Sequence, residues 1–295
     1  MNIGKQLLLL AGTAFAFSAT ASAQVLVFEE YFDYDGTLNN NENIANAPGW
    51  TGGTNNIRYR DSSQGGQLSF TGTGYVPTHA GGYLNSGQSN SSDWRGSNAA
   101  LGQALSGEFW ISAFVNPVGM TNDNGSITLL SLNTGGTSNS SPNGQGFGVY
   151  NSGGGTLNFV VANGLSIIET GPSATANTWN LVLARVNINE SADDQVDLWF
   201  YGDDASVPVD LVSLGAPHLT SDTIDWGDSI NTINVGGQSI ETTGGKEANW
   251  DDLRVSARSG QSGLEDVLGI PEPRVYAAIF GVFALGFVLW RRRRG

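Results

Sequence analysis

The sequence predicts an all-β protein built as a β-sandwich. Glycine, serine, asparagine and threonine are abundant, with 41 glycines in 295 residues, and helical spacing of apolar residues is nearly absent from the body of the chain. Short runs rich in β-branched and aromatic residues recur instead, separated by clusters of turn-forming residues. Many short strands joined by long polar loops favour a sandwich over alternating strands and helices.

Eleven runs along the body have the composition of strands. Each is bounded by residues that favour turns, so we expect each to form one strand. In chain order, the expected strands are Val25 to Phe32, Gln67 to Phe70, Glu108 to Asn116, Ser126 to Asn133, Gly146 to Tyr150, Thr156 to Ala162, Trp179 to Asn189, Gln195 to Tyr201, Val209 to Ser213, Thr232 to Gly236 and Ala248 to Ser256.

The clearest pair of strands is the hairpin from Trp179 to Tyr201. Alternate residues of its first strand are aliphatic, and residues 189–194 supply a polar turn. In its second strand Trp199 and Tyr201 lie on the face opposite Leu198. One face of the hairpin is therefore expected to be core, and the other carries aromatic and polar groups, as in sheets that bind flat ligands.

Charge is distributed unevenly along the chain. All 27 acidic residues lie between Glu29 and Glu272, whereas six of the 13 basic residues lie outside residues 24–273. That segment carries 7 basic residues against 27 acidic ones, a net charge of −20. Such a surface repels nucleic acids, so we expect no nucleic-acid partner. The absence of cysteine excludes disulfides and cysteine-ligated metals.

Residues 1–23 have the features of a signal peptide. Lys5 precedes an apolar stretch of about a dozen residues, and Ala21 and Ala23 form a small-x-small cleavage site. We therefore expect signal peptidase to release a mature chain that begins at Gln24. An uncleaved N-terminal anchor is the alternative, but the apolar stretch is short for that role.

Residues 271–295 have three parts. Two prolines that flank a glutamate form an extended joint, because proline fits neither a helix interior nor a central strand. The apolar run at about 275–290 predicts a single transmembrane helix, shorter than the ~20 residues that usually span a bilayer. Four arginines follow it and favour a cytoplasmic end, which leaves the body on the other side of the membrane.

In order, spacing and polarity, this ending resembles the PEP-CTERM sorting signal of Gram-negative bacteria. The resemblance implies transient anchoring in the inner membrane with the body in the periplasm. It then implies recognition by an exosortase, an integral membrane transpeptidase, and delivery to the cell surface or the extracellular exopolysaccharide matrix. Without an exosortase, the tail is an ordinary single-pass anchor. The residues to which the resemblance assigns sorting are Pro271, Glu272, Pro273, Arg291, Arg292, Arg293 and Arg294.

Three motifs of the body carry a second resemblance. They are the hairpin that ends in Val196 to Gly202, the ending Trp250 to Val255, and the opening Phe28 to Tyr34 followed by Gly49 and Trp50. Together they resemble LamG-like, concanavalin-type jelly rolls. The resemblance implies a jelly roll of two antiparallel sheets that often binds a glycan or a protein. We therefore assign residues 24–256 to one concanavalin-like jelly-roll β-sandwich and residues 257–270 to a polar spacer.

Catalytic residues are not evident in the sequence. Glycoside hydrolysis needs two positioned carboxylates, and the Glu-x-Asp-x-x-Glu pattern of laminarinase-type enzymes of this fold is absent. His79 and His218 have no partner at metal-ligand spacing and are expected to be ordinary loop residues. We therefore expect a non-enzymatic protein. A polysaccharide-degrading enzyme of concanavalin-like fold and a purely structural matrix protein remain the alternatives.

Calcium is the one cofactor that the sequence suggests. Carboxylate oxygens suit this cation, and the jelly-roll resemblance places one ion between the first and last strands. It points to Glu30 and Asp252, or to Glu29 and Asp251 if the register differs by one. The alternative is that these acids bind no metal.

A glycan-binding surface needs exposed aromatic rings with polar neighbours. The competing interpretation is that most tryptophans fill the core, which we expect for Trp110 and Trp179 because they lie in apolar strands. The residues that fit a glycan-binding role are Trp94, Trp199, Tyr201 and Trp226.

Overall fold

The computed structural model describes most of the body and one short piece of the tail. The described residues are 26–34, 37–39, 42–51, 57–64, 68–77, 81–86, 95–120, 125–135, 145–190, 192–238, 248–270 and 286–291. Several predictions concern residues outside these ranges and remain predictions. They are those for Ala21, Ala23, His79, Trp94, Pro271, Glu272, Pro273, Arg292, Arg293 and Arg294.

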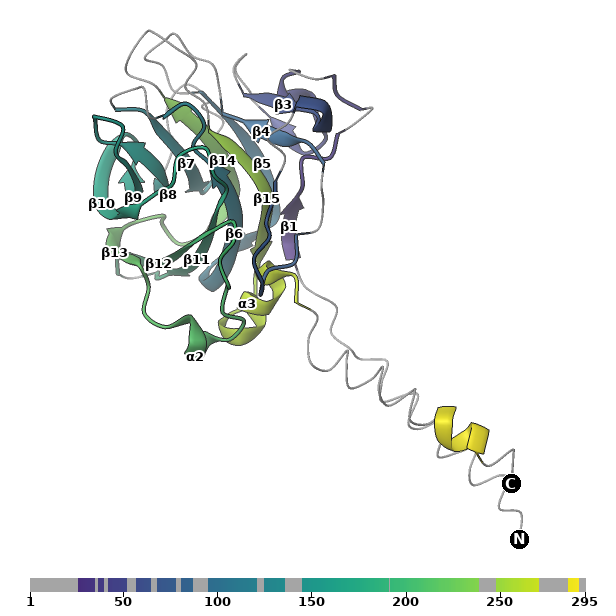
Figure 1. Cartoon of the computed structure of the whole chain (residues 1–295). Coiled ribbons are helices and arrows are strands. Elements are labelled where there is room, and N and C mark those ends of the chain that lie inside the picture. The colour runs from purple at the N-terminus through teal and green to yellow at the C-terminus, as the bar shows by residue number, and fades with distance from the viewer. Residues whose placement is uncertain are drawn as a thin grey trace.

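The described strands form two antiparallel sheets (Figure 1). An eight-stranded sheet runs through β13 (Leu219–Ile224), β12 (Asp194–Gly202), β11 (Asn180–Ile188), β6 (Gly107–Asn116), β15 (Asn249–Ser256), β4 (Tyr83–Asn85) and β3 (Arg58–Arg60), and β1 (Leu26–Glu30) also pairs with β15. A seven-stranded sheet runs through β10 (Ser166–Ser173), β9 (Leu157–Asn163), β8 (Gln145–Asn151), β7 (Ile127–Asn133), β14 (Ile230–Gln238), β5 (Arg95–Leu105) and β2 (Trp50–Thr51). The predicted all-β sandwich is thereby confirmed.

Nine of the eleven expected strands are present, and two expectations were wrong. Residues 68–70 form no strand, although Phe70 packs its ring against Phe114 of β6. The run from Val209 to Ser213 turns into a helix, because Asp210 caps it and accepts a hydrogen bond from the Ser213 N–H at 2.9 Å. The described helical segments of the body are η2 (Ile44–Asn46), η3 (Ser62–Gln64), α2 (Leu211–Leu214) and α3 (Gly260–Leu268).

The main hydrophobic core lies between the two sheets. Along β6, Phe109, Ile111 and Val115 face this core, whereas Trp110 and Phe114 face the opposite side of the sheet. Both sets are buried. The eight-stranded sheet is therefore covered on both faces, and the aromatic side of the central hairpin is not an open surface.

The outer face of the eight-stranded sheet is covered by α3, which contacts β6 and β15 and lies beside α2 (Figure 1). Leu264, Val267 and Leu268 are fully buried against the outer aromatic layer. Their spacing gives the helix one apolar face, and Gly269 ends it in a left-handed conformation with φ +72°. The expectation that residues 257–270 form a loose polar spacer was therefore wrong.

A buried arginine joins this helix to the sheet. Arg254 of β15 has no exposed side-chain surface, and its Nε lies 3.0 Å from Oδ1 of Asp252. Its Nη2 donates to the Val76 carbonyl at 2.7 Å and its Nη1 to the Val267 carbonyl at 3.3 Å. The guanidinium also lies 4.8 Å from the ring centre of Tyr75. One side chain thus connects β15, the 75–77 segment and α3.

The tail is described only at residues 286–291, which are helical. Phe287, Val288, Leu289 and Trp290 are exposed there. Over the part of the chain that the structure describes, no helix has the length and hydrophobicity needed to cross a membrane. Most of the predicted transmembrane helix at about 275–290 lies outside the described residues.

Replacing Arg254 by alanine is expected to lower the free energy of unfolding by about 3–5 kcal/mol, because it leaves a buried carboxylate without its cation. Arg185→Ala is the matched control. Arg185 is about one-third exposed, and its partner Asp197 also accepts hydrogen bonds from Gln195 and Thr220, so we expect a loss of about 1 kcal/mol or less. Urea denaturation measures both. Equal losses would contradict the role given to Arg254.

Candidate functional site between the sheet edges

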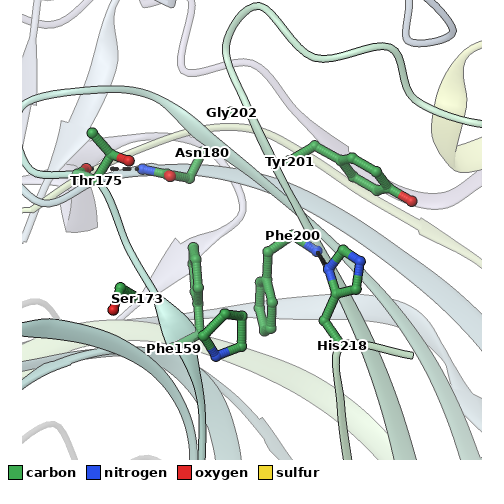
Figure 2. A pocket seen from close by; sticks show the side chains of 9 residues that line it. Phe159, Ser173, Thr175, Asn180, Phe200, Tyr201, Gly202 and His218 are labelled. Carbon is green, nitrogen blue, oxygen red and sulfur yellow. Dashed lines mark hydrogen bonds between the residues drawn. The ribbon is translucent and has the colours of Figure 1, made fainter. Parts of the chain in front are cut away.

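A pocket of about 470 Å³ opens between the edges of the two sheets, where β10 approaches β13. Its wall residues come from β9, β10, the segment after β10, and the β11 to β13 region. They are Phe159, Pro172, Ser173, Thr175, Asn180, Phe200, Tyr201, Gly202 and His218 (Figure 2). Sequence reasoning selected only Tyr201 of this set.

The floor of the pocket is a pair of stacked aromatic rings. Phe159 of β9 and Phe200 of β12 face each other across the sandwich, with ring centres 3.8 Å apart and planes at 10° (Figure 2). Both rings belong to the main core and are almost fully buried. Because each comes from a different sheet, this pair fixes the position of the pocket relative to both sheets.

Tyr201 and His218 lie together at one edge of the pocket, where the Tyr201 ring packs against the outer aromatic layer and not against the phenylalanine pair. Their ring centres lie 5.8 Å apart, and the Tyr201 hydroxyl points away from the phenylalanine pair in Figure 2. Burial raises the pKa of Tyr201 to about 12. The phenol therefore stays protonated at neutral pH and can donate a hydrogen bond.

His218 is held in one orientation by the backbone. The backbone N–H of His218 donates to the Leu198 carbonyl at 2.8 Å, and the ring Nδ1 accepts from the backbone N–H of Phe200 at 3.0 Å. Burial lowers the pKa of His218, so the ring is neutral at pH 7. Since Nδ1 accepts, the proton of the neutral ring is on Nε2, and this atom is a hydrogen-bond donor.

The rim of the pocket is polar and uncharged. Asn180 is buried, and its Nδ2 donates to the carbonyls of Thr178 at 2.7 Å and Thr175 at 3.2 Å, which holds the turn before β11. Ser173 and Thr175 are exposed beside it. None of the nine described wall residues carries a charged side chain at neutral pH. The pocket thus offers an apolar floor with neutral hydrogen-bonding groups at its edge.

Two of the aromatic residues expected to be exposed for glycan binding are buried. Trp199 is buried beneath α2 and α3, where it stacks on Trp110 with ring centres 5.7 Å apart. Trp226 is also buried, and its Nε1 donates to the Gln145 carbonyl at 2.8 Å. Both side chains are part of the packing. Of the described candidates, Tyr201 borders this pocket.

The carboxylates proposed for calcium are not paired as expected. Glu30 lies on the main-core side, where it accepts hydrogen bonds from Tyr34 at 2.6 Å and Trp50 at 2.8 Å. Asp252 lies on the outer side with Arg254, which also approaches Glu29 at 3.8 Å. Within the described ranges, no group of three or more His, Asp or Glu side chains is arranged to hold a metal ion. The pair Glu30 and Asp252 therefore does not fit a calcium site.

The carboxylates pair differently from the expectation because β15 contains a bulge. Trp250 and Leu253 both face the main core, so two residues lie between them where strict alternation allows one. The pairing register shifts there, and Asp252 has a left-handed φ of +46°. As a result Asp251 approaches Glu30, whereas Asp252 approaches Glu29 through the shared arginine. Glu30 and Asp252 therefore lie on opposite sides of the sheet, and so do Glu29 and Asp251.

No family model matches the chain, and no curated protein matches its sequence. Among solved structures, a PL-14 alginate lyase from Aplysia kurodai is 9% identical, with a TM-score of 0.42 over 78% of this chain and 98% of the other. An endo-β-1,4-glucuronan lyase from Trichoderma reesei is 13% identical, with a TM-score of 0.40 over 78% and 95%.

The CBM2 module of the evolved Dit of Lactobacillus casei BL23 phage J-1 is 9% identical, with a TM-score of 0.43 over 78% of this chain and 94% of the other. All three TM-scores are below 0.5. These likenesses therefore assign neither a ligand nor an activity to the chain.

Asp251→Asn is expected to stabilise the protein at neutral and higher pH. Asp251 is buried, and burial, followed by the charges of Asp252 and Glu30, raises its pKa well above the usual value. The folded state then binds the proton more tightly than the unfolded state, so the free energy of unfolding falls as the pH rises toward the folded-state pKa. The advantage of the variant should grow over that window and be smallest near pH 4.

Urea denaturation across pH 4–8 in a chelator measures this difference, with the exposed Asp193→Asn as control. A variant that is no more stable than the parent at pH 8 would contradict the expectation. A second series with calcium in place of the chelator tests whether a cation binds near Asp251. A stabilisation of the parent that Asp251→Asn lacks would put an ion beside Asp251.

Proposed function

We propose that the body of this chain is a non-enzymatic binding domain that takes a neutral segment of a glycan in the pocket between the sheet edges. The observation that carries the proposal is the combination of the stacked Phe159–Phe200 floor with Tyr201, His218 and the hydroxyl-bearing rim. Sugars present C–H faces to aromatic rings and hydroxyls to hydrogen-bonding groups. The volume of about 470 Å³ falls within the range of small-ligand sites.

The protonation states favour binding over catalysis. A general base needs an atom that can accept a proton, but Nδ1 of His218 is occupied by the Phe200 N–H and Nε2 already carries a proton. The high pKa of Tyr201 leaves its phenol neutral. The described wall contains no carboxylate, so it lacks the acid pair of glycoside hydrolysis.

A polysaccharide-degrading enzyme is the second candidate, because Tyr201 and His218 stand side by side as two titratable groups in one pocket. Such an enzyme would need the histidine ring to rotate and free an acceptor nitrogen. Turnover of a bound polysaccharide would then accompany binding, which the experiment below measures directly.

We also propose that the chain is exported, anchored by its tail, and processed at the Pro-Glu-Pro joint by an exosortase, which delivers the body to the cell surface or matrix. The support is the sequence of the joint, the apolar run and the four terminal arginines. Signal peptidase and the exosortase are the processing partners in this proposal, and a surface or matrix glycan is the ligand.

Tyr201→Ala is expected to weaken glycan binding about tenfold, because it removes an aromatic ring and a hydroxyl donor whose contacts together contribute about 1.4 kcal/mol. Tyr201→Phe keeps the ring and should lose less. The probes are an array of neutral and acidic oligosaccharides and the exopolysaccharide fraction of the host, with binding measured by calorimetry. Release of reducing ends or unsaturated products is followed in the same samples.

Tyr150→Ala is the matched control, because Tyr150 is also half-buried but packs on the seven-stranded sheet, in a different hydrophobic cluster. Thermal unfolding checks that each variant is folded. Equal loss of binding in Tyr150→Ala and Tyr201→Ala would contradict the pocket assignment. Product release by the parent that Tyr201→Phe abolishes would favour the enzyme.

Processing of the native protein predicts a defined mass. We expect a species that begins at Gln24, ends within residues 271–273 and fractionates with the cell surface or matrix. Any additional mass at its C-terminus would represent a transferred acceptor. A species that keeps Arg291 to Arg294 and stays in the inner membrane would contradict sorting and leave a tethered periplasmic domain. Intact-mass analysis of cell fractions distinguishes the two.

A further inference from the structure

Three exposed valines lie on the face of the body that carries α2 and α3. Val76 is 50% exposed, Val209 is 43% exposed and Val212 is 92% exposed. In the described part of the body, Leu165 is the one other large hydrophobic side chain that is exposed. Exposed apolar side chains that gather on one face indicate a contact surface more strongly than scattered ones.

Hydrogen bonds to α3 hold Val76, Val209 and Leu211, the residue before Val212, in place. The Val76 N–H donates to the Leu268 carbonyl at 3.0 Å, at the end of the helix. Near its start, Gln261 accepts from the Leu211 N–H at 3.0 Å and donates to the Val209 carbonyl at 2.9 Å. We call Val76, Val209 and Val212 the valine surface. It spans the length of α3 and belongs to a fixed part of the fold.

The chain leaves the body from this same face. Ile270 packs against the outer hydrophobic layer, and its N–H donates to the Glu265 carbonyl at 3.0 Å. Five residues further on, Val275 begins the apolar run of the tail. Five extended residues span at most about 18 Å. A tail inserted in a bilayer would therefore hold the α3 face within that distance of the lipid surface.

We propose that the valine surface contacts the lipid bilayer while the tail is anchored. The proposal rests on the membrane anchoring proposed above and adds the orientation of the body to it. A short tether keeps the local concentration of the surface at the bilayer high, so contacts too weak to bind a free protein to lipid become populated. Val212 is the expected deepest point, because it is almost fully exposed on the tip of α2.

Charge identifies the kind of lipid surface. The two carboxylates beside the valines are already engaged, Asp210 with Ser213 and Glu265 with Gln261. The body as a whole is strongly acidic and is repelled by anionic headgroups. The contact is therefore apolar, and it should be stronger on zwitterionic bilayers than on anionic ones.

The absence of cysteine makes the test direct, since one introduced cysteine gives one labelled position. Val212→Cys reports on the valine surface. Leu165→Cys is the matched control, because Leu165 is 48% exposed and lies in the turn between β9 and β10 of the other sheet. Each full-length variant carries a polarity-sensitive fluorophore and is reconstituted into phosphatidylcholine vesicles that contain a headgroup-level quencher.

Quenching at residue 212 should exceed quenching at residue 165 by about threefold or more, as expected for a side chain at the interface. It should fall when Val76 and Val209 are both replaced by aspartate, and when phosphatidylglycerol replaces part of the lipid. Vesicle flotation shows separately whether the tail is inserted. The spectra of both labels in unfolding scans verify that each variant is folded.

Equal quenching at the two positions in floated vesicles would overturn the proposal and leave the anchoring intact. Failure of the chain to float would show that the anchoring itself is wrong, and the proposal would fall with it. If label 212 is equally shielded in lipid-free protein, another part of the chain or a second copy covers the surface. That result would also overturn a lipid contact.

Discussion

The buried guanidinium of Arg254 joins the three parts of the molecule that meet on the outer face of the eight-stranded sheet. It is balanced by Asp252 and donates to the carbonyls of Val76 and Val267. A guanidinium does not lose its proton inside a protein, so burial is tolerable only while all of these acceptors are in place. The geometry of β15, of the 75–77 segment and of α3 is thus mutually dependent. The exit point of the chain is fixed with them.

The extra residue in β15 determines on which side each acidic residue lies. Because the bulge falls between Trp250 and Leu253, Asp252 faces the arginine, and Asp251 remains on the side of Glu30. With strict alternation in β15, Asp252 would have faced the same side of the sheet as Glu30, and Asp251 the same side as Glu29. The protein supplies its own cation to one of the two aspartates, and burial raises the pKa of the other.

Residues with clear alternation could be located from the sequence, whereas those that depend on tertiary contacts could not. β11 and β12 alternate, β6 is a run rich in β-branched and aromatic residues, and all three were expected at nearly their observed bounds. β5 is built from small residues and becomes a strand by pairing with β14 and β2. In α3 the apolar residues follow a glycine- and serine-rich start, which hid a helix that packing stabilises.

Trp199 was misread because its face of the sheet has a second layer over it. The pocket could not be predicted because its walls come from both sheets, so Phe159 and His218 line one cavity only after the two sheets pack.

The β12 strand separates the two surfaces to which functions are proposed. Phe200 points inward to the pocket floor, and its neighbour Trp199 points outward beneath α2. Across the sheet, α3 lies over β6 and β15, whereas the pocket opens beside β13 at the sheet edge. A body that rests on a bilayer through the α2–α3 face would therefore keep the pocket at its side, accessible to a polymer that lies along the membrane. Anchoring and ligand binding place no conflicting demand on any side chain, so the domain could bind its glycan both before and after release from the tail.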